Sequence, residues 1–366
     1  MNKASANRLS VACGGLSAYD IVWQRGFGAI SDELLKLGFG ERKACIVTDS
    51  NVAPLHLDSL VQAIRPVFKE VTVYQFPAGE VHKNLDTVRG LYTHLIESSF
   101  ERKDCLVALG GGVVGDLTGY AAATYLRGIR FIQVPTSLLA MVDSSIGGKT
   151  GVDFDRYKNM VGAFYQPSLV YMNLSVLLTL NDREYLSGMG EIIKHGLIRD
   201  AEYYHWLSLH RQAILNRDYE TLLIMIRESC EIKRSVVERD PKEEGERALL
   251  NFGHTLGHAV EKLKFPALLH GECVAIGMAA AAWLSVRKSS LSNEDYEGII
   301  QMLQSFYLPV SVSQISAEAV VETAGHDKKM DAGQWKFILL KQIGCAVIDR
   351  TVTKEDAKEA ALKILV

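Results

Sequence analysis

The chain has 366 residues, enough for two domains, and its 48% hydrophobic and 23% charged residues are typical of a globular protein. A net charge of -3 gives no electrostatic reason to expect nucleic acid or an anionic membrane as a partner. The N-terminal segment lacks the apolar core of a signal peptide, and the longest apolar run, Val274 to Val286, is too short to span a bilayer. Six scattered cysteines form no CxxC pair. These features predict a cytoplasmic protein with reduced thiols and a buried helix at the apolar run.

Strands and helices are expected to alternate in the first half of the chain. Short apolar runs predict strands at residues 43–48, 71–76, 105–109 and 131–134, and amphipathic stretches predict helices at about 55–68 and 85–98. This alternation is typical of a parallel sheet with right-handed crossovers. We therefore expect an α/β domain with a Rossmann-like parallel sheet over residues 1–178.

A glycine loop with the sequence GGGVVGD, residues 110–116, follows the third of these strands. Glycines between a strand and a helix let backbone N–H groups approach a phosphate at the positive end of the helix dipole. The spacing differs from the GxGxxG dinucleotide fingerprint, and a tight turn without a ligand is the alternative. Because ligands bind at the carboxyl ends of parallel strands, residues after the first two strands are candidates for ribose and adenine contacts. They are Asp49, Asn51, Glu80 and Lys83.

The segment over residues 142–167 is rich in glycine and polar side chains. Its composition predicts a surface loop, and loops on a rigid scaffold often carry function. Lys149 follows two glycines and is a candidate clamp for a phosphate or carboxylate. A charged, solvent-facing loop without a ligand is the alternative.

Beyond Asn173 the pattern changes to helical periodicity. Helices are expected at about 183–199, 201–214, 218–239, 248–263, 271–287, 293–306 and 354–364, with a strand pair at 336–340 and 346–349. The change predicts a second, mostly α-helical domain over residues 179–366.

Three of the ten histidines fall close together in this second part. His254 and His258 are four residues apart in an expected helix, so they share a face, and His270 follows a break at Phe265-Pro266. Converging histidines suit a divalent transition metal such as zinc. A pair of ordinary helix-surface histidines is the alternative.

A carboxylate upstream completes a possible metal set. Glu191 and Lys194 lie three residues apart among apolar neighbours, so they are expected to face the interior, with a surface ion pair as the alternative. Glu191 with His254 and His270 has the composition of a catalytic zinc site, which uses three protein ligands.

Seven motifs occur in the order and at the spacing of one known family. They are GGGVVGD, ATYLRGIRFIQVPTSLLAMVDSSIGGKTGV, KNMVGAFYQP, GEIIKHGLI, RALLNFGHTLGHAVE, LHGE and HDKK. Through them nearly the whole chain resembles the 3-dehydroquinate synthases of the sugar phosphate cyclase superfamily. The resemblance implies an enzyme of the shikimate pathway that uses NAD⁺ and Zn²⁺, with Co²⁺ as the alternative metal. It would convert the sugar phosphate 3-deoxy-D-arabino-heptulosonate 7-phosphate to 3-dehydroquinate and phosphate, with NAD⁺ bound by residues 1–178 and metal and substrate by residues 179–366.

The resemblance also implies roles residue by residue. The metal falls on Glu191, His254 and His270, whereas His258 lies beside the substrate phosphate. Phosphate contacts fall on Lys149, Asn159, Asn251, His258 and Arg127, and a neighbouring subunit is expected to donate Arg127, which implies a homodimer. Arg247 would hold the substrate carboxylate, and Lys194, Lys233, Asp143 and Glu243 fall on other active-site positions. One lysine of Asp327-Lys328-Lys329 is also expected to contact the anion. NAD contacts fall on Asp49, Glu80, Lys83, Gly111, Gly112, Gly115, Asp116, Thr136 and Ser137, beside the strand-end residue Asn51.

Two positions depart from the family pattern. Asn181 stands where proline is expected, and it is a good helix N-cap; Asp153 stands where asparagine is usual. Three other functions stay open. They are a cyclase of the 2-deoxy-scyllo-inosose or valiolone type with a carboxylate-free substrate, a metal-dependent polyol or glycerol-phosphate dehydrogenase that releases NADH, and a non-catalytic binding protein. Arg247, Lys233 and the Asp327-Lys328-Lys329 motif together favour a carboxylated substrate.

Overall fold

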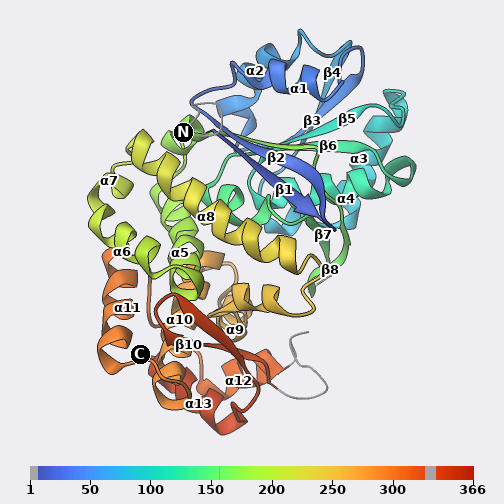
Figure 1. The fold of residues 1–366 in the computed structure, drawn as a ribbon. Coiled ribbons are helices and arrows are strands. Elements are labelled where there is room, and N and C mark those ends of the chain that lie inside the picture. Colours follow the sequence, from blue (N-terminus) through green and yellow to red (C-terminus); the bar gives the residue numbers. More distant parts are fainter. Residues whose placement is uncertain (1–6, 156, 326–334) are drawn as a thin grey trace. The chain divides into compact units, whose positions relative to one another are not determined.

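A computed structural model of the chain describes residues 7–155, 157–325 and 335–366 (Figure 1). The chain divides into two compact units, Met1–Leu180 and Asn181–Val366. The first contains a mostly parallel sheet and the second consists mainly of helices, which confirms the expected fold class. The functions assigned to the two parts stay predictions.

In the described part of the first unit, seven strands form one sheet in the order β1-β2-β9-β6-β5-β3-β4 (Figure 1). Their bounds are β1 Arg8–Cys13, β2 Leu16–Gln24, β3 Lys43–Asp49, β4 Glu70–Phe76, β5 Cys105–Gly110, β6 Arg130–Pro135 and β9 Leu169–Asn173. Neighbouring strands are parallel except β1 and β2, which form an antiparallel edge. The four expected strands are confirmed as β3 to β6, whereas β1, β2 and β9 were not expected. Because β3 to β6 are parallel, the loops after them lie along one edge of the sheet.

Helices of the first unit pack apolar faces against this sheet. Their bounds are α1 Ile30–Lys36, α2 Ala53–Ile64, α3 Leu85–Glu97 and α4 Gly112–Thr124, with short helical turns at Glu80–His82, Tyr125–Arg127, Ala140–Ser144 and Leu174–Leu178. Leu91 of α3 and Leu117 of α4 share one buried cluster with Val47 of β3 and Leu106 of β5. Each such side chain contributes about 1.5–3 kcal/mol when fully buried. This packing fixes the glycine loop, which begins α4, at the edge of the sheet.

The prediction of a surface loop over residues 142–167 is wrong for much of this segment. β7 (Lys149–Phe154) and β8 (Tyr157–Phe164) form an antiparallel hairpin. Thr150 and Val152 of β7 are buried, whereas most of β8 is exposed. A Cβ on Gly151 or Gly162 would collide with the backbone of the opposite strand, so the hairpin needs both glycines. Glycines usually weaken a strand, so their presence in this segment argued against predicting one.

The described residues of the second unit form helices and one strand pair. Its elements are α5 Asp182–Arg199, α6 Ala201–Leu209, α7 Arg211–Leu215, α8 Tyr219–Arg239, a 3₁₀ turn at Glu246–Asn251, α9 His254–Lys264, α10 His270–Lys288, α11 Asn293–Ser305, α12 Ala317–Gly325, β10 Phe337–Gln342, β11 Cys345–Asp349 and α13 Lys354–Lys363. The helix expected at 201–214 is divided into α6 and α7, and α12 was not expected. The helix expected at 248–263 begins only at His254, because Gly253 adopts a φ of 81° and interrupts it.

The core of the second unit is built around α10. Val260 of α9, Ile276 of α10, Val320 of α12, Leu339 of β10 and Ala360 of α13 belong to one fully buried cluster. The apolar run from Val274 to Val286 therefore forms a buried helix, as expected. Among the described residues, no helix combines the length and apolar character needed to cross a bilayer.

Candidate functional site

Helix α5 carries the candidate metal carboxylate. Its N-cap is Asn181, whose side chain accepts the backbone N–H of Glu184 at 2.9 Å, so the residue that replaces the family's proline does start the helix. Glu191 and Lys194, ten and thirteen residues after Asn181, are 0% and 1% exposed. Lys194 Nζ donates to Glu191 Oε2. The expectation that this pair faces the interior is confirmed.

Close glycine contacts bring three helices of the second unit together. A Cβ on Gly271 of α10 would overlap the backbone carbonyl of Ser187 on α5, and a Cβ on Gly277 would overlap the carbonyl of Gly253 just before α9. Only glycine allows helix backbones to approach this closely. The contacts place Glu191 of α5 beside the first residues of α9 and α10, which are both histidines.

These two histidines, His254 and His270, point one nitrogen at the same oxygen. Nε2 of His254 and Nε2 of His270 each lie 3.5 Å from Oε1 of Glu191. Tetrahedral zinc with bonds of about 2.0–2.1 Å places its ligand atoms about 3.4 Å apart. One carboxylate oxygen and two imidazole nitrogens therefore converge with spacings that a zinc ion could bridge.

The other ring nitrogen of each histidine is also engaged. Nδ1 of His254 lies 3.2 Å from the backbone carbonyl of Phe252, and Nδ1 of His270 lies 3.1 Å from Oε2 of Glu261. Burial alone would lower the pKa of His270, but the carboxylates of Glu191 and Glu261 raise that pKa to about 10. A metal ion must displace this proton, because a histidine ligand binds as neutral imidazole.

His258 lies close enough to be a rival ligand. Its ring centroid is 4.9 Å from that of His254 and 5.8 Å from that of His270, and the three histidines could offer nitrogens within 4.8 Å of one another. The distances alone therefore do not show whether His258 is a metal ligand or only lies beside the ligands. The division of roles between His254 and His258 stays a prediction.

A tight loop between α8 and α9 presents two of the candidate anion-binding groups of the second unit, Arg247 and Asn251. Arg247 is 3% exposed, and its Nη1 donates to the carbonyl of Pro241 at 2.6 Å; Asn251 Nδ2 donates to Glu243 Oε1 at 2.6 Å. Lys233 of α8 is also buried. The side chain that stabilises this loop belongs to Asp240, for which the sequence predicted no role.

Asp240 holds the loop through its side chain. Its carboxylate accepts the backbone N–H groups of Glu244 at 2.9 Å, Gly245 at 2.7 Å and Arg247 at 2.9 Å. Burial alone would raise the pKa of Asp240, but these donors lower it below the ordinary value. The ionised carboxylate therefore fixes the backbone that carries Arg247.

In the first unit, Lys83 forms hydrogen bonds with two other expected site residues. Its Nζ donates to Asp116 Oδ2 at 2.7 Å and to Asn159 Oδ1 at 2.7 Å, and Glu80 forms a longer pair with Lys158 at 3.9 Å. Burial alone would lower the pKa of Lys83, but the carboxylates of Asp116 and Glu80 raise it. The ammonium is therefore charged and links α4 with the β7–β8 hairpin.

The glycine loop contains glycines of two kinds. A Cβ on Gly115 would lie 2.6 Å from the side chain of Gln133 on β6, so packing of α4 demands this glycine. A Cβ on Gly111 would meet Ser137 Oγ at 3.4 Å, which is an ordinary contact. Internal packing thus leaves Gly111 unexplained, as expected where a ligand approaches the backbone. Gly112 begins α4.

The remaining expected residues of the first unit lie at strand ends and turns. The Asp49 side chain accepts the N–H of Asn51 at 2.8 Å after β3, and the N–H of Thr136 donates to Gly110 at 2.9 Å after β6. Ser137 Oγ accepts the N–H of Ala140 at 3.2 Å. Three others lie nearby in sequence: Arg127 is exposed with a φ of 67°, Asp143 lies in the turn Ala140–Ser144, and Lys149 is exposed at the start of β7.

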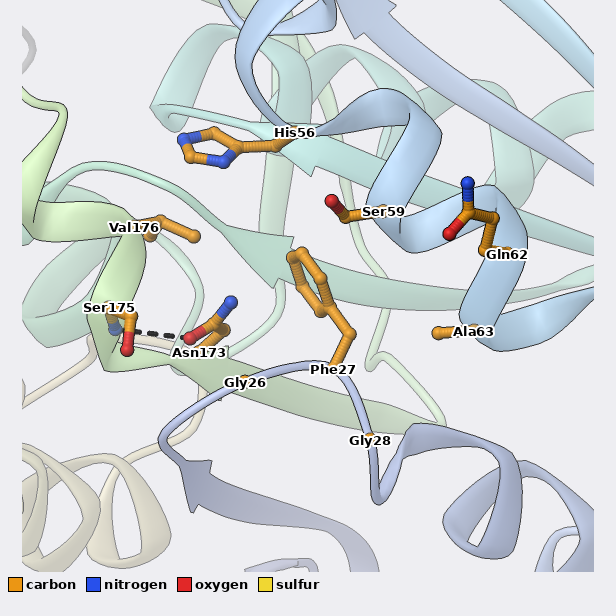
Figure 2. A pocket seen from close by; sticks show the side chains of 10 residues that line it. All are labelled: Gly26, Phe27, Gly28, His56, Ser59, Gln62, Ala63, Asn173, Ser175 and Val176. Carbon is orange, nitrogen blue, oxygen red and sulfur yellow. Dashed lines mark hydrogen bonds between the residues drawn. The ribbon is translucent and has the colours of Figure 1, made fainter.

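A separate depression of about 530 Å³ lies elsewhere in the first unit (Figure 2). It is lined by residues 26–28, by side chains of α2 and by the segment after β9. Figure 2 shows the Phe27 ring projecting into it, facing Ser59 of α2. None of the expected site residues lines it, so it adds nothing to the candidate site.

Sequence reasoning missed the residues that support the site. Asp240 lies outside the quoted motifs. Glu261 is the last residue of RALLNFGHTLGHAVE and was given no role, although it falls seven residues after His254 and thus on the same helix face. The close contacts of Gly271 and Gly277 depend on neighbours distant in sequence. The expected Asp327-Lys328-Lys329 contact lies outside the described residues.

Comparison with known proteins identifies the family. Models of the N-terminal and C-terminal parts of 3-dehydroquinate synthase match residues 73–187 and 188–330. The chain is 47% identical over 312 residues to the 3-dehydroquinate synthase of Nitrosomonas europaea, covering 85% of each protein. It is 44% identical over 315 residues to that of Acetivibrio thermocellus, covering 86% of this chain and 87% of the relative.

Solved structures give the same picture of the fold. The 2-epi-5-epi-valiolone synthase of Streptomyces hygroscopicus subsp. jinggangensis, with NAD⁺ and Zn²⁺ bound, superposes with a TM-score of 0.88 at 27% identity and covers 97% of this chain and 99% of that one. A 2-deoxy-scyllo-inosose synthase with carbaglucose-6-phosphate, NAD⁺ and Co²⁺ also has a TM-score of 0.88, at 23% identity over 98% of this chain and all of that one, which is a likeness of fold. As its motifs indicated, the chain belongs to the 3-dehydroquinate synthase family.

Proposed function

We propose that this chain converts 3-deoxy-D-arabino-heptulosonate 7-phosphate to 3-dehydroquinate and inorganic phosphate, the activity for which its relatives are named. The observation that carries the proposal is the convergence of Glu191, His254 and His270 on one point in the second unit. This reaction joins a redox step, loss of phosphate and ring closure. The protein must therefore hold a metal, a nicotinamide cofactor and two anionic groups of one substrate.

We assign Glu191, His254 and His270 as the metal ligands. Their donor types and separations suit zinc, and Co²⁺ accepts the same kinds of ligand. A divalent ion held there would act as a Lewis acid that stabilises negative charge on a substrate oxygen, a contribution of several kcal/mol. Lys194, bonded to the other oxygen of Glu191, orients this carboxylate.

We assign the NAD⁺ site to the edge of the parallel sheet in the first unit. Supporting observations are the room at Gly111, the start of α4 at Gly112 and the position of Asp49 after β3. Bound there, NAD⁺ would take up a hydride from a substrate alcohol and return it. Asp116, Thr136, Ser137, Asn51, Glu80, Lys83, Gly112 and Gly115 are assigned to the same site.

Lys83 supports the assignment of Asn159 to the substrate phosphate. Because an ammonium can only donate, the atom of Asn159 that faces Lys83 is its oxygen. The amide N–H groups then point away and remain suited to an anion. We assign phosphate contacts to Asn159, Lys149 and Arg127 in the first unit, and to His258 and Asn251 in the second. Donors of this kind stabilise phosphate as it leaves, and the phosphate can itself take up the neighbouring proton.

Arg247 is assigned to the substrate carboxylate, with Lys194, Lys233, Asp143 and Glu243 as further active-site groups. A guanidinium offers two parallel N–H donors that match a carboxylate. The loop fixed by Asp240 would present this group with little loss of conformational entropy. This assignment separates the proposed activity from that of cyclases whose substrates lack the carboxylate.

Substrate choice tests the proposal. The zinc-loaded protein with NAD⁺ should release phosphate from the heptulosonate phosphate and not from a heptulose phosphate without the carboxylate. Arg247→Lys should lower kcat/KM for the carboxylated substrate about 100-fold, because a lysine lacks the planar fork. Phosphate release from the carboxylate-free heptulose phosphate alone would instead assign the chain to the valiolone type.

We also propose that the chain acts as a homodimer in which a neighbouring subunit donates Arg127. The exposure of Arg127 in the described chain supports this role. An inactive Arg127→Ala variant mixed with an inactive His254→Ala variant should recover part of the activity through mixed dimers. Absence of any recovery, with mixed dimers demonstrated by mass spectrometry, would contradict a shared site.

A further inference from the structure

We propose that Glu261 is a positioning residue for the metal site, because it selects which nitrogen of His270 faces the metal. Its Oε2 lies 3.1 Å from Nδ1 of His270, and its side chain is only 12% exposed. The inference rests on the proposed ligand set of Glu191, His254 and His270. It adds a residue that touches neither metal nor substrate.

A neutral imidazole has two tautomers. Such a ring carries one N–H and one lone pair, on either nitrogen. A carboxylate only accepts, so Glu261 draws the N–H to Nδ1 and leaves the lone pair on Nε2. Nε2 is the atom that lies 3.5 Å from Glu191 Oε1. A metal ion that displaces the second proton of His270 therefore meets the lone pair on Nε2.

Helix α9 supplies both a ligand and this support. His254 is its first residue, and Glu261 lies two turns later on the same face, where it reaches His270 at the start of α10. His254 receives its own orientation from the backbone carbonyl of Phe252. Different groups therefore orient the two ligands. The group that orients His270 is a side chain, so a substitution can remove it, whereas the group that orients His254 is a backbone carbonyl.

Zinc affinity provides the test. Loss of an outer-shell partner of this kind costs about 10–100-fold in metal affinity. Glu261→Ala should weaken Zn²⁺ binding by that factor, measured by competition with a chelator at fixed pH without substrate or NAD⁺. Glu261→Gln retains a weaker acceptor and should lose less. Glu228→Gln, which removes a half-exposed carboxylate paired with Arg227 on α8, should bind zinc as the unsubstituted chain does.

A double-mutant cycle separates positioning from a general effect of charge. In a His270→Ala background, adding Glu261→Ala should change Zn²⁺ affinity by less than about twofold, because no ring remains to orient. The absorption spectrum of bound Co²⁺ should change in Glu261→Ala alone. Unchanged zinc affinity in the single variants, or equal losses with and without His270, would overturn the inference. If Glu261→Ala does not fold, Glu261→Gln decides. A chain that shows this pattern but releases no phosphate would refute the proposed function and leave the inference standing.

Discussion

Two histidines one helical turn apart on α9 receive different roles in this account. His254 reaches Oε1 of Glu191 at 3.5 Å and has its Nδ1 held by a backbone carbonyl, which is the arrangement of a metal ligand. His258 is partly exposed and is assigned to the phosphate. Their spacing predicted a shared helix face and no more. The partner that distinguishes them is on α5, and its position depends on tertiary packing.

Metal content tests this division directly. His254→Ala should lose zinc after dialysis, whereas His258→Ala should retain nearly one ion per chain and lose catalytic rate, because a donor to the phosphate is missing. Metal analysis of both purified variants measures the difference. Zinc loss in a folded His258→Ala protein would show that His258 is a ligand.

At the scale of elements, helix contacts through glycine assemble the metal site. Gly271 of α10 lies against the backbone of α5, and this contact brings His270 to Glu191. Gly271→Ala should lower the free energy of unfolding by about 3 kcal/mol, because the new methyl group overlaps a carbonyl that belongs to a rigid helix. It should also weaken zinc binding, since the two ligands move apart. Urea unfolding and zinc titration measure the two effects.

Gly298 offers a matched control for this substitution. It lies within α11, where a Cβ would have no heavy atom within 4 Å. Gly298→Ala should therefore stabilise the chain by about 0.5–1 kcal/mol through helix propensity alone. Equal effects of the two substitutions would contradict the role given to the close contact.

The loop between α8 and α9 depends on one carboxylate. Asp240→Asn should lower the free energy of unfolding at neutral pH by about 1–3 kcal/mol, because three backbone N–H groups lose a charged acceptor. The pKa of Asp240 is lowered in the folded state, so its contribution is complete above the ordinary aspartate pKa and is lost as the pH falls through the lowered value. The difference between the two proteins should therefore narrow in acid. A difference that stays constant with pH in urea unfolding would point to packing instead.

At the scale of the whole molecule, local patterns predicted the parts of the fold that local forces determine. The strands β3 to β6 carry short, mostly apolar runs, and the buried α10 carries a long apolar run, so both were expected. The β7–β8 hairpin was missed, because its glycines are explained only by the opposite strand. The start of α9 was misplaced, because Gly253 adopts its left-handed conformation where α9 packs against α10.

In the candidate site, too, some residues could be predicted from the sequence and others could not. Residue types at motif spacing indicated Glu191, His254 and His270 before any geometry was considered. The supporting residues Asp240 and Glu261 act through contacts made only in the folded chain. The spacing of Glu261 from His254 indicates a shared helix face but does not indicate the contact of Glu261 with His270. Physical support for a site is thus harder to predict than its ligands.

The central claim is that one chain performs a redox-neutral cyclisation. The most direct measurement follows phosphate, 3-dehydroquinate and NADH together during incubation with the heptulosonate phosphate, zinc and catalytic NAD⁺. We expect equal amounts of phosphate and 3-dehydroquinate, many turnovers for each NAD⁺ and no net accumulation of NADH. NADH that accumulates in step with substrate loss, or no phosphate release by folded, zinc-loaded protein, would contradict it.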